Sequence, residues 1–336
     1  MKIIADAFGG DNAPDEIIRG CREAADERGV SMILTGDTQK IKKASEKISV
    51  DISDMEIIDA PDVMTMEDDP REILRAKKNS SMAAGLAALH EGAGDAFVSA
   101  GSTGALVVGS TFIVKRIKGV RRVAIGAVMP AQNSPFMLID AGATFDCKPE
   151  TLVLFGIMGN IFMNKVLGIE KPRIALANNG SEATKGTPLY KEAYDLMSNA
   201  PFNFTGNIEG RRIPYGDADV IVCDGFTGNL ILKTYEGVAK MLTTEMKDMF
   251  MKNAFTKMSA LGVASGLKDL KTRMDYKTYG GAPILGVSKP VVKAHGSSDA
   301  KSFKNSIKQA KLCVDGKVPQ LIGEYVPPKE DEKDDA

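Results

Sequence analysis

Two loops in this chain combine glycine with a side chain that could stabilise negative charge. Asn229 ends the segment Gly225-Phe226-Thr227-Gly228-Asn229, and Lys185 lies in the loop 178–186. A lysine close to the backbone supplies a cation, and an asparagine supplies a neutral hydrogen-bond donor. Because both groups stabilise charge that develops on an oxygen atom, the pair indicates a site for an anionic reactant.

Each of these loops follows a short run of β-branched or small apolar residues, which is typical of a buried strand of a parallel sheet. Three more such runs lead into polar loops with glycine, at 6–14, 100–106 and 140–144. Loops of this kind lie at the carboxyl edge of an open α/β sheet, where ligands bind and free helix N–H groups favour anions. Tight turns also need glycine for positive φ, but five loops that hold Asp, Asn, Thr or Lys favour a ligand site. Neither a Walker loop nor G-x-G-x-x-G in its required context occurs, so ATP and dinucleotide binding gain little support.

Alternating strands and helices must position these loops. We expect strands near 2–5, 31–35, 56–58, 95–99, 123–129, 136–140, 173–177 and 219–223, and helices near 14–28, 38–48, 70–91, 103–117, 149–166 and 188–198. This alternation predicts a doubly wound α/β/α sandwich with a mostly parallel sheet and helices on both faces. The turn-rich segment 129–135 predicts a local hairpin. We assign one α/β domain to 1–328 and expect the polar tail 329–336 to be disordered.

Composition is typical of a soluble enzyme. The chain has 336 residues, of which 43% are hydrophobic and 26% charged, which is enough for a substantial core. Its net charge of −1 argues against nucleic-acid binding, which normally needs a basic excess. The four cysteines are scattered without a metal-binding spacing, so we interpret them as reduced packing residues. We find no signal peptide and no apolar run of membrane-spanning length, and expect a cytoplasmic location.

Six ordered segments resemble the PlsX family of phosphate acyltransferases, from Met1 to about Val326. They are DAFGGDNAP at the start, VSAGSTGAL at 98–106, IDAGATFDC at 139–147, NNGSEATKG at 178–186, VCDGFTGNL at 222–230, and GGAPILGV with KAHGSSD near the end. The family pattern has asparagine where Ser102 and Thr144 stand. It has isoleucine and glutamates where Asn179, Ser181 and Ala183 stand, so negative charge around Lys185 is lower here.

The resemblance implies the fold, the reaction and the partners. The implied fold is Rossmann-like and related to the isocitrate/isopropylmalate dehydrogenase and phosphotransacetylase folds. The implied reaction moves a long-chain acyl group from acyl carrier protein to inorganic phosphate without a cofactor. The acyl-phosphate then feeds glycerol-3-phosphate acylation in bacterial phospholipid synthesis. The implied protein is a homodimer that contacts the inner face of the membrane and the downstream glycerol-3-phosphate acyltransferase.

Phosphate is itself the nucleophile in such a reaction, so no Ser-His-Asp array is required and none is visible. We expect Lys185 and Asn229 to be catalytic, although Lys185 could be a solvated surface lysine and Asn229 a helix cap. The expected substrate-binding residues are Asp6, Gly9, Gly10, Asp11, Gly101, Ser102, Thr103, Gly104, Asp140, Gly142, Thr144, Asp224, Thr227, Gly228 and His295. The aspartates could suggest a magnesium site, but we assign them mainly to fixing loop backbones and predict no metal. His90 we interpret as a packing or surface residue.

The segment 238–276 differs from the rest because methionine, phenylalanine and leucine alternate with lysine. Such a stripe can be core, a dimer interface or an interfacial membrane helix, and the resemblance favours a projecting helical pair with the last two roles. We expect Gly262 and Gly266 to break one long helix into two, with Leu261 and Val263 at the membrane-facing tip. The basic cluster Lys115–Arg122 is the candidate docking surface for an acidic acyl carrier protein, although a charge run is usually a solvated face.

Two other functions stay open at this stage. One is a phosphate acetyl- or butyryltransferase that uses coenzyme A thioesters. The other is a non-catalytic module that binds lipids or anions, suggested by the absence of an obvious general base.

Overall fold

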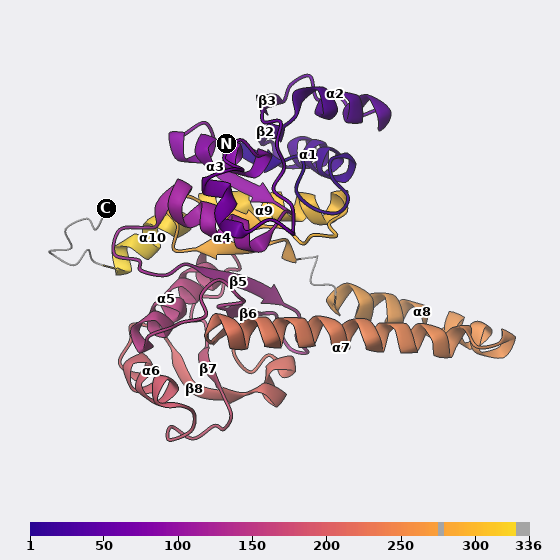
Figure 1. Ribbon diagram of the computed structural model, residues 1–336. Coiled ribbons are helices and arrows are strands. Elements are labelled where there is room, and N and C mark those ends of the chain that lie inside the picture. Colours follow the sequence, from indigo (N-terminus) through magenta and orange to yellow (C-terminus); the bar gives the residue numbers. More distant parts are fainter. Residues whose placement is uncertain (275–278, 327–336) are drawn as a thin grey trace.

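The computed structural model describes residues 1–274 and 279–326 and has helices on both faces of one sheet (Figure 1). The strands are β1 (Lys2–Asp6), β2 (Ser31–Gly36), β3 (Glu56–Asp59), β4 (Ala96–Ser99), β5 (Ala124–Met129), β6 (Phe136–Ile139), β7 (Ile174–Asn178), β8 (Phe204–Glu209), β9 (Val220–Val222), β10 (Ala282–Leu285) and β11 (Val291–Lys293). The helices are α1 (Asp15–Arg28), α2 (Thr38–Lys47), η1 (Pro70–Leu74), α3 (Ser81–Glu91), α4 (Thr103–Gly109), η2 (Ser110–Lys115), α5 (Pro149–Lys165), α6 (Pro188–Ser198), η3 (Gly210–Tyr215), α7 (Gly225–Met251), α8 (Ala254–Met274), α9 (Ala300–Asp315) and α10 (Val318–Tyr325).

Strand residues alternate between two sides of the sheet, and each side has its own helices. On one side, Ile4, Leu138 and Ile221 pack with α3, α4 and the first turns of α7. On the other side, Ile3 and Ala5 pack with α1, α2 and α9, while farther along the sheet β6 and β9 pack with α5, α6 and α10. The alternation follows from the two-residue period of an extended chain. The predicted doubly wound α/β sandwich is therefore confirmed.

The direction of the strands changes in the middle of the sheet. The order is β3-β2-β1-β4-β11-β10-β5-β6-β9-β7-β8. Strands β1, β4 and β11 are parallel to one another, and β10 is antiparallel to both β11 and β5. Strand β6 is antiparallel to β5 and parallel to β9, which is parallel to β7. The carboxyl ends of β1, β4 and β11 therefore lie at one edge of the sheet, and those of β6, β7 and β9 lie at the opposite edge.

Several elements differ from the sequence-based expectation. The hairpin at 129–135 is confirmed, since β5 and β6 pair antiparallel across it. The single helix expected at 70–91 is wrong: η1 ends at Leu74, and α3 begins after Ser80, whose side chain accepts a hydrogen bond from the Ala83 N–H (3.3 Å). The helix expected at 103–117 changes into one π-helical turn at Ser110. Strands β8, β10 and β11 and helices α9 and α10 were not predicted.

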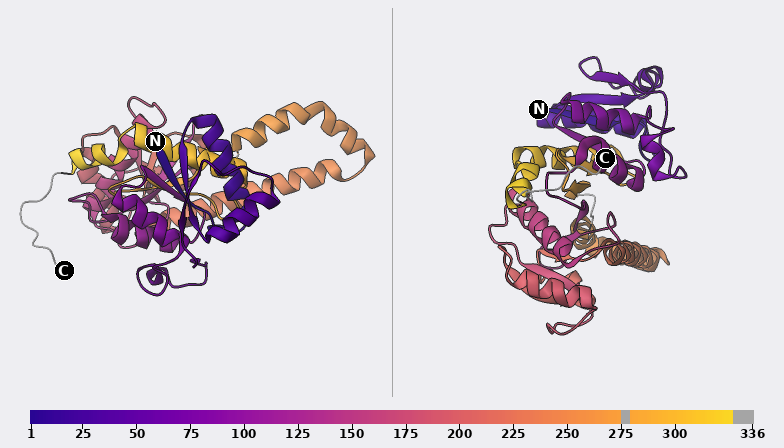
Figure 2. Two further views of the ribbon diagram at one scale, coloured as in Figure 1. Left: turned by 90° about the horizontal axis from the view of Figure 1, so that it is seen from above. Right: turned by 60° about the vertical axis from the view of Figure 1, so that its left-hand side comes forward.

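A pair of long helices, α7 and α8, projects from the α/β body (Figures 1 and 2). The expectation that Gly262 and Gly266 break one helix into two is wrong, because both lie inside α8. The break falls at Lys252–Asn253, where the Asn253 side chain accepts a hydrogen bond from the Thr256 N–H (3.0 Å) and begins the second helix. The side chain of Leu261 and the tail 329–336 lie outside the described residues.

Candidate functional site

The loops after β1, β4 and β11 meet at one edge of the sheet. The Asp11 N–H donates to the Gly296 carbonyl (2.8 Å), and the Asn12 side chain donates to the Ser298 carbonyl (3.1 Å). Gly10 has a φ of +98°, and a Cβ there would lie 2.8 Å from the Gly296 oxygen, so only glycine fits this contact. The N-terminal loop is thus fixed to the loop that carries His295.

Asp6, at the end of β1, holds the backbone of these loops in place. Its carboxylate is buried and accepts hydrogen bonds from the Ser99 hydroxyl (2.7 Å) and the Phe8 N–H (3.2 Å). A Cβ on Gly9 would lie 2.7 Å from the Asp6 Oδ2, so the Gly9 backbone covers the carboxylate. Burial raises the pKa of Asp6, while hydrogen bonds from Ser81 and Ser99 oppose the rise.

The glycines and hydroxyls of the loop after β4 are used mainly in local structure. The buried Ser102 side chain accepts a hydrogen bond from the Ala105 N–H (3.4 Å) at the start of α4. Gly101 donates its N–H to the Ser99 hydroxyl (3.0 Å). Gly104 lies against Pro70 of η1, and a Cβ added to Gly104 would lie 2.7 Å from the Pro70 Cγ. Thr103 is half-buried, and His295 is exposed, with its Nδ1 accepting a hydrogen bond from the Ser297 N–H (3.1 Å).

At the opposite edge, Asp140 organises the loop after β6. It is fully buried, and its carboxylate accepts hydrogen bonds from the N–H groups of Ile125, Gly142, Ala143 and Thr144 at 2.6–3.1 Å. Burial raises the pKa of Asp140, and these N–H groups oppose the rise. The Thr144 hydroxyl donates to the Val123 carbonyl (2.9 Å), so this buried side chain also fixes the loop.

Asp224 caps α7 beside that loop. Its carboxylate accepts hydrogen bonds from the Thr227 N–H (2.9 Å) and hydroxyl (2.8 Å) and from the Tyr190 hydroxyl of α6 (2.5 Å). Burial raises the pKa of Asp224, but the hydrogen bonds from Tyr190 and Thr227 outweigh burial and lower it below its ordinary value. Asp224 therefore stays ionised and holds the start of α7 in place.

The start of α7 packs closely against Asp140, and the exposed Asn229 lies next to Gly142. A Cβ on Gly228 would lie 1.8 Å from the Asp140 carbonyl oxygen, and one on Gly142 would lie 3.4 Å from the Asn229 Cβ. Asn229 itself is exposed. The exposed Lys185 lies in the loop after β7, where its carbonyl accepts a hydrogen bond from the Asn178 side chain (3.2 Å).

The predicted residues therefore form two groups instead of one. Asp6, Asp11, Ser102 and His295 belong to one edge of the sheet, and a second set belongs to the other. The second set is Asp140, Gly142, Thr144, Lys185, Asp224, Thr227, Gly228 and Asn229.

Helix α7 connects the two groups. It begins beside Asp140 at one edge, and its third turn reaches the end of β5, where the Tyr235 hydroxyl donates to the Pro130 carbonyl (2.7 Å).

Three polar residues near these two groups were not identified from the sequence: Tyr190, Lys233 and Lys293. Lys293 ends β11, is half-buried, and its Nζ donates to the Ala100 carbonyl (3.2 Å). Burial, and then the charge of Lys233, lower the pKa of Lys293 to about 8. The only available signal was the position of Lys293 directly before the His295 loop, because its burial depends on strand pairing.

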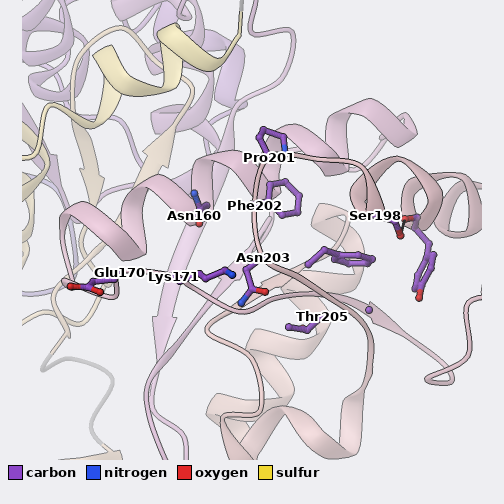
Figure 3. Close-up of a pocket in the computed structure, with 11 residues that line it drawn as sticks. Asn160, Glu170, Lys171, Ser198, Pro201, Phe202, Asn203 and Thr205 are labelled. Carbon is purple, nitrogen blue, oxygen red and sulfur yellow. Dashed lines mark hydrogen bonds between the residues drawn. The ribbon is translucent and has the colours of Figure 1, made fainter.

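A pocket of about 730 Å³ lies elsewhere, at the amino ends of β7 and β8 (Figure 3). Asn160 of α5, Ser198 of α6 and Phe202 contribute to its walls. None of the predicted site residues lines it, so we do not assign the chemistry to this pocket. Within residues 1–274 and 279–326, no helix is both long and apolar enough to cross a membrane.

The sandwich and its glycine-rich loops define a doubly wound α/β protein, and solved structures of other proteins share this fold. The fold is similar to a phosphotransacetylase from Streptococcus pyogenes, with a TM-score of 0.61, 18% identity, and coverage of 96% of this chain and 94% of that one. A branched-chain phosphotransacylase from Enterococcus faecalis is similar too, with a TM-score of 0.57, 16% identity, and coverage of 94% and 99%. A 4-hydroxythreonine-4-phosphate dehydrogenase from Klebsiella pneumoniae, at a TM-score of 0.54, 15% identity, and coverage of 94% and 99%, shares this fold.

The chain belongs to the family described as fatty acid synthesis protein, whose sequence profile matches residues 1–321. It is 47% identical over 326 residues to a phosphate acyltransferase of Alkaliphilus oremlandii, covering 97% of both chains. It is 46% identical over 323 residues to a phosphate acyltransferase of Clostridium acetobutylicum, covering 96% of this chain and 98% of that one. The family resemblance inferred from the six motifs is thus confirmed.

Proposed function

We propose that this protein is a phosphate acyltransferase that uses acyl carrier protein thioesters as acyl donors. The observation that carries the proposal is the arrangement along α7, which places the exposed amide of Asn229 beside the Asp140 loop. The two phosphate acyltransferases at 46–47% identity support the reaction class.

In this reaction a phosphate oxygen attacks the thioester carbonyl carbon. A C–O bond forms and the C–S bond breaks. The attacking hydrogen phosphate releases its proton to solvent, and the departing thiolate takes up one proton from solvent. Negative charge collects on the carbonyl oxygen in the transition state, where a fixed donor is worth most. Asn229 is assigned to donate to that oxygen, because its helix start is held by Asp224 and by the close contact of Gly228 with Asp140. Lys185 is assigned to stabilise the same charge from its flexible side chain.

The remaining assignments concern partners. An acidic acyl carrier protein is assigned to the exposed basic residues of 115–122. A second copy of the chain is assigned to the exposed large apolar side chains of α7, such as Met241 and Leu242. The tip of the α7–α8 pair is assigned to the membrane surface. The acyl-phosphate would then be consumed in glycerol-3-phosphate acylation.

Product analysis with two kinds of donor tests the proposal. The purified protein is incubated with inorganic phosphate and either palmitoyl-acyl carrier protein or acetyl- and butyryl-coenzyme A. Acyl-phosphate is trapped with hydroxylamine as the hydroxamate. We expect product from the carrier-protein thioester at a kcat/KM at least ~100-fold higher than from either coenzyme A ester. A preference for coenzyme A esters would favour a phosphate acetyl- or butyryltransferase, and no product from any donor would defeat the enzymatic function.

A further inference from the structure

Lys293 lies at the end of β11, a central strand of the sheet. It is the last residue of β11, paired with Ser99 of β4 on one side and with Ala282 of β10 on the other. Its Nζ donates to the main-chain carbonyls of Ala100 and Ala294. A lysine ammonium has three N–H donors, so these two carbonyls leave one donor for a further partner.

The charge of Lys293 lacks a direct counterion in the described part of the chain. No described carboxylate lies within ion-pair distance of its Nζ. The nearby Asp6 carboxylate already accepts hydrogen bonds from Ser99 and Phe8, and Asp11 is exposed. Removing a cation from water without a paired anion is unfavourable, and the lowered pKa of Lys293 reflects that cost. An anionic ligand would relieve it.

A second lysine, on α7, lies close enough for its charge to act on Lys293. Lys233 lies one helical turn beyond Asn229, which is about 6 Å along the helix axis. Its charge disfavours the protonated form of Lys293, whereas Asp11 and Asp6 favour it. Lys233 is exposed, and Glu236 on its own helix pairs with it at 2.8 Å. Lys293 at the end of β11 and Lys233 on α7 thus bring two positive charges from different elements near each other, an arrangement that would attract a small anion.

The other lysine of the same β10–β11 segment has a plain structural role. Lys289 donates to the Leu89 carbonyl (2.6 Å) at the end of α3, where a cation favours the carboxyl end of the helix dipole. Lys289 is therefore a matched control: a half-buried lysine that also donates to a main-chain carbonyl, away from α7.

We propose that Lys293, with Lys233 opposite it, binds the inorganic phosphate that attacks the acyl donor. This assignment rests on the proposed function and adds the nucleophile's position to it. Phosphate would lie beside Lys233 of α7, one helical turn from Asn229, to which the carbonyl oxygen is assigned.

Phosphate binding to the full chain without any acyl donor tests the assignment directly. Isothermal titration with inorganic phosphate compares the parent with Lys293→Met, Lys233→Met and Lys289→Met. We expect a ~10- to 100-fold weaker Kd for Lys293→Met, as for loss of a charged hydrogen bond, a smaller loss for Lys233→Met, and no change for Lys289→Met. In turnover assays, the KM for phosphate should rise in the first two variants while the KM for the acyl donor stays the same.

The pH dependence separates a phosphate ligand from a merely structural lysine. Above pH 7.5 phosphate is already mostly dianionic, so its own charge changes little. Parent binding should weaken as the pH rises beyond about 8, because Lys293 then loses its proton, and Lys293→Met should lack this pH dependence.

Parent-like phosphate affinity in a folded Lys293→Met protein overturns the assignment, as does an equal loss in Lys289→Met. If Lys293→Met does not fold, parent-like affinity in Lys233→Met, a surface change, overturns it instead. A parent that binds phosphate through these lysines but forms no acyl-phosphate would defeat only the proposed function. Turnover with an unchanged phosphate KM in both variants would defeat only this assignment.

Discussion

The residues at the start of α7 show how buried groups hold an exposed one in position. Asp224 caps the helix, Tyr190 and Thr227 keep its carboxylate oriented, and Gly228 allows contact with the Asp140 carbonyl. These groups stabilise the fold, and Asn229 is the exposed residue that they position. Of the aspartates expected to bind substrate, Asp6 and Asp140 are buried and already accept hydrogen bonds from the protein. Their observed partners agree with the sequence-based interpretation that they mainly fix loops.

We predict that Asn229→Ala and Lys185→Ala each remove most turnover without unfolding the protein. Each variant deletes a donor assigned to charge that develops in the transition state, which costs about 2.7–4 kcal/mol, or ~10²–10³ in kcat. Steady-state kinetics and thermal melting of the purified variants check the prediction. Near-parent kcat values in both variants would exclude these two roles.

We predict that Gly228→Ala strongly destabilises the protein, by more than ~3 kcal/mol, because its Cβ would overlap the Asp140 carbonyl oxygen at 1.8 Å. Gly237→Ala is the control, since no atom lies within 4 Å of a Cβ there and alanine favours the helix by up to ~1 kcal/mol. Urea denaturation gives both free energies of unfolding. Similar values for the two variants would contradict the observed packing.

Among the elements, α7 is unusual because it is long and little of it is buried. Of its 27 residues, only Gly225 and Gly228 are fully buried. Its exposed large apolar side chains are Phe226, Leu230, Val238, Met241, Leu242, Met249 and Met251. These side chains all fall within about half of the helix circumference, which we call the apolar side of α7. An apolar surface of this extent is typical of an interaction site.

We predict that this apolar side holds a homodimer together. Met241→Glu with Leu242→Glu should convert the protein to monomers, because two charges would be buried in an apolar interface. Thr243→Glu, on the opposite side of the same turn, should leave the dimer intact. Light scattering after size-exclusion chromatography measures the mass. A parent that is already monomeric, or a double variant that stays dimeric, would exclude this interface.

We predict that the tip of the α7–α8 pair contacts membranes. Phe255 and Met258 follow the break at Lys252–Asn253 and are 75% and 68% exposed, beside Lys252 and Lys257. Apolar side chains flanked by lysines bind anionic bilayers by burial and charge together. Phe255→Glu with Met258→Glu should abolish co-sedimentation with phosphatidylglycerol-containing vesicles, while Met66→Glu, an exposed methionine of the α/β body, should not.

The double variant should keep the parent's mass, melting temperature and acyltransfer in solution. Val263, predicted from the sequence to lie at the tip, is exposed at 46% but lies farther along α8. Continued co-sedimentation, or loss of the dimer together with vesicle binding, would refute a membrane role for the tip.

On the scale of the whole molecule, a net charge of −1 conceals local basic surfaces. Lys115, Arg116, Lys118, Arg121 and Arg122 are all exposed between η2 and β5. Such a cluster increases the association rate with an acidic protein at low salt.

We predict that Lys118→Glu with Arg122→Glu raises the KM for acyl carrier protein thioesters by ~10-fold at low ionic strength and leaves the KM for phosphate unchanged. The difference should shrink in 0.5 M NaCl, because salt screens exposed charges. Lys42→Glu with Lys43→Glu on α2 makes the same change in charge elsewhere and should behave like the parent. Equal effects of the two double variants would show that only net charge matters.

The sequence by itself determined the features that depend on neighbouring residues. The strand, polar loop and helix at 220–230, the hairpin at 129–135, and the six family motifs each follow from local residue type and spacing. The predicted helix boundaries were wrong where the side chain of Ser80 or Asn253 caps a helix start that the sequence pattern did not indicate. The short strands β10 and β11 were also missed, because three or four residues carry too little periodicity to be recognised.

Only the tertiary structure decided which loops lie together. Strand order depends on hydrogen bonding between distant segments: β11 pairs with β4, and β10 pairs with β5, which joins the first strands of the chain to the strands beyond the β5–β6 hairpin, where the direction of the sheet reverses. The fold brings Lys293 close to Lys233, one helical turn from Asn229, although Asn229 and Lys293 lie 64 positions apart in the sequence. The desolvation of Lys293 has the same origin, because the charge and burial around a side chain are set by long-range packing that no local pattern contains.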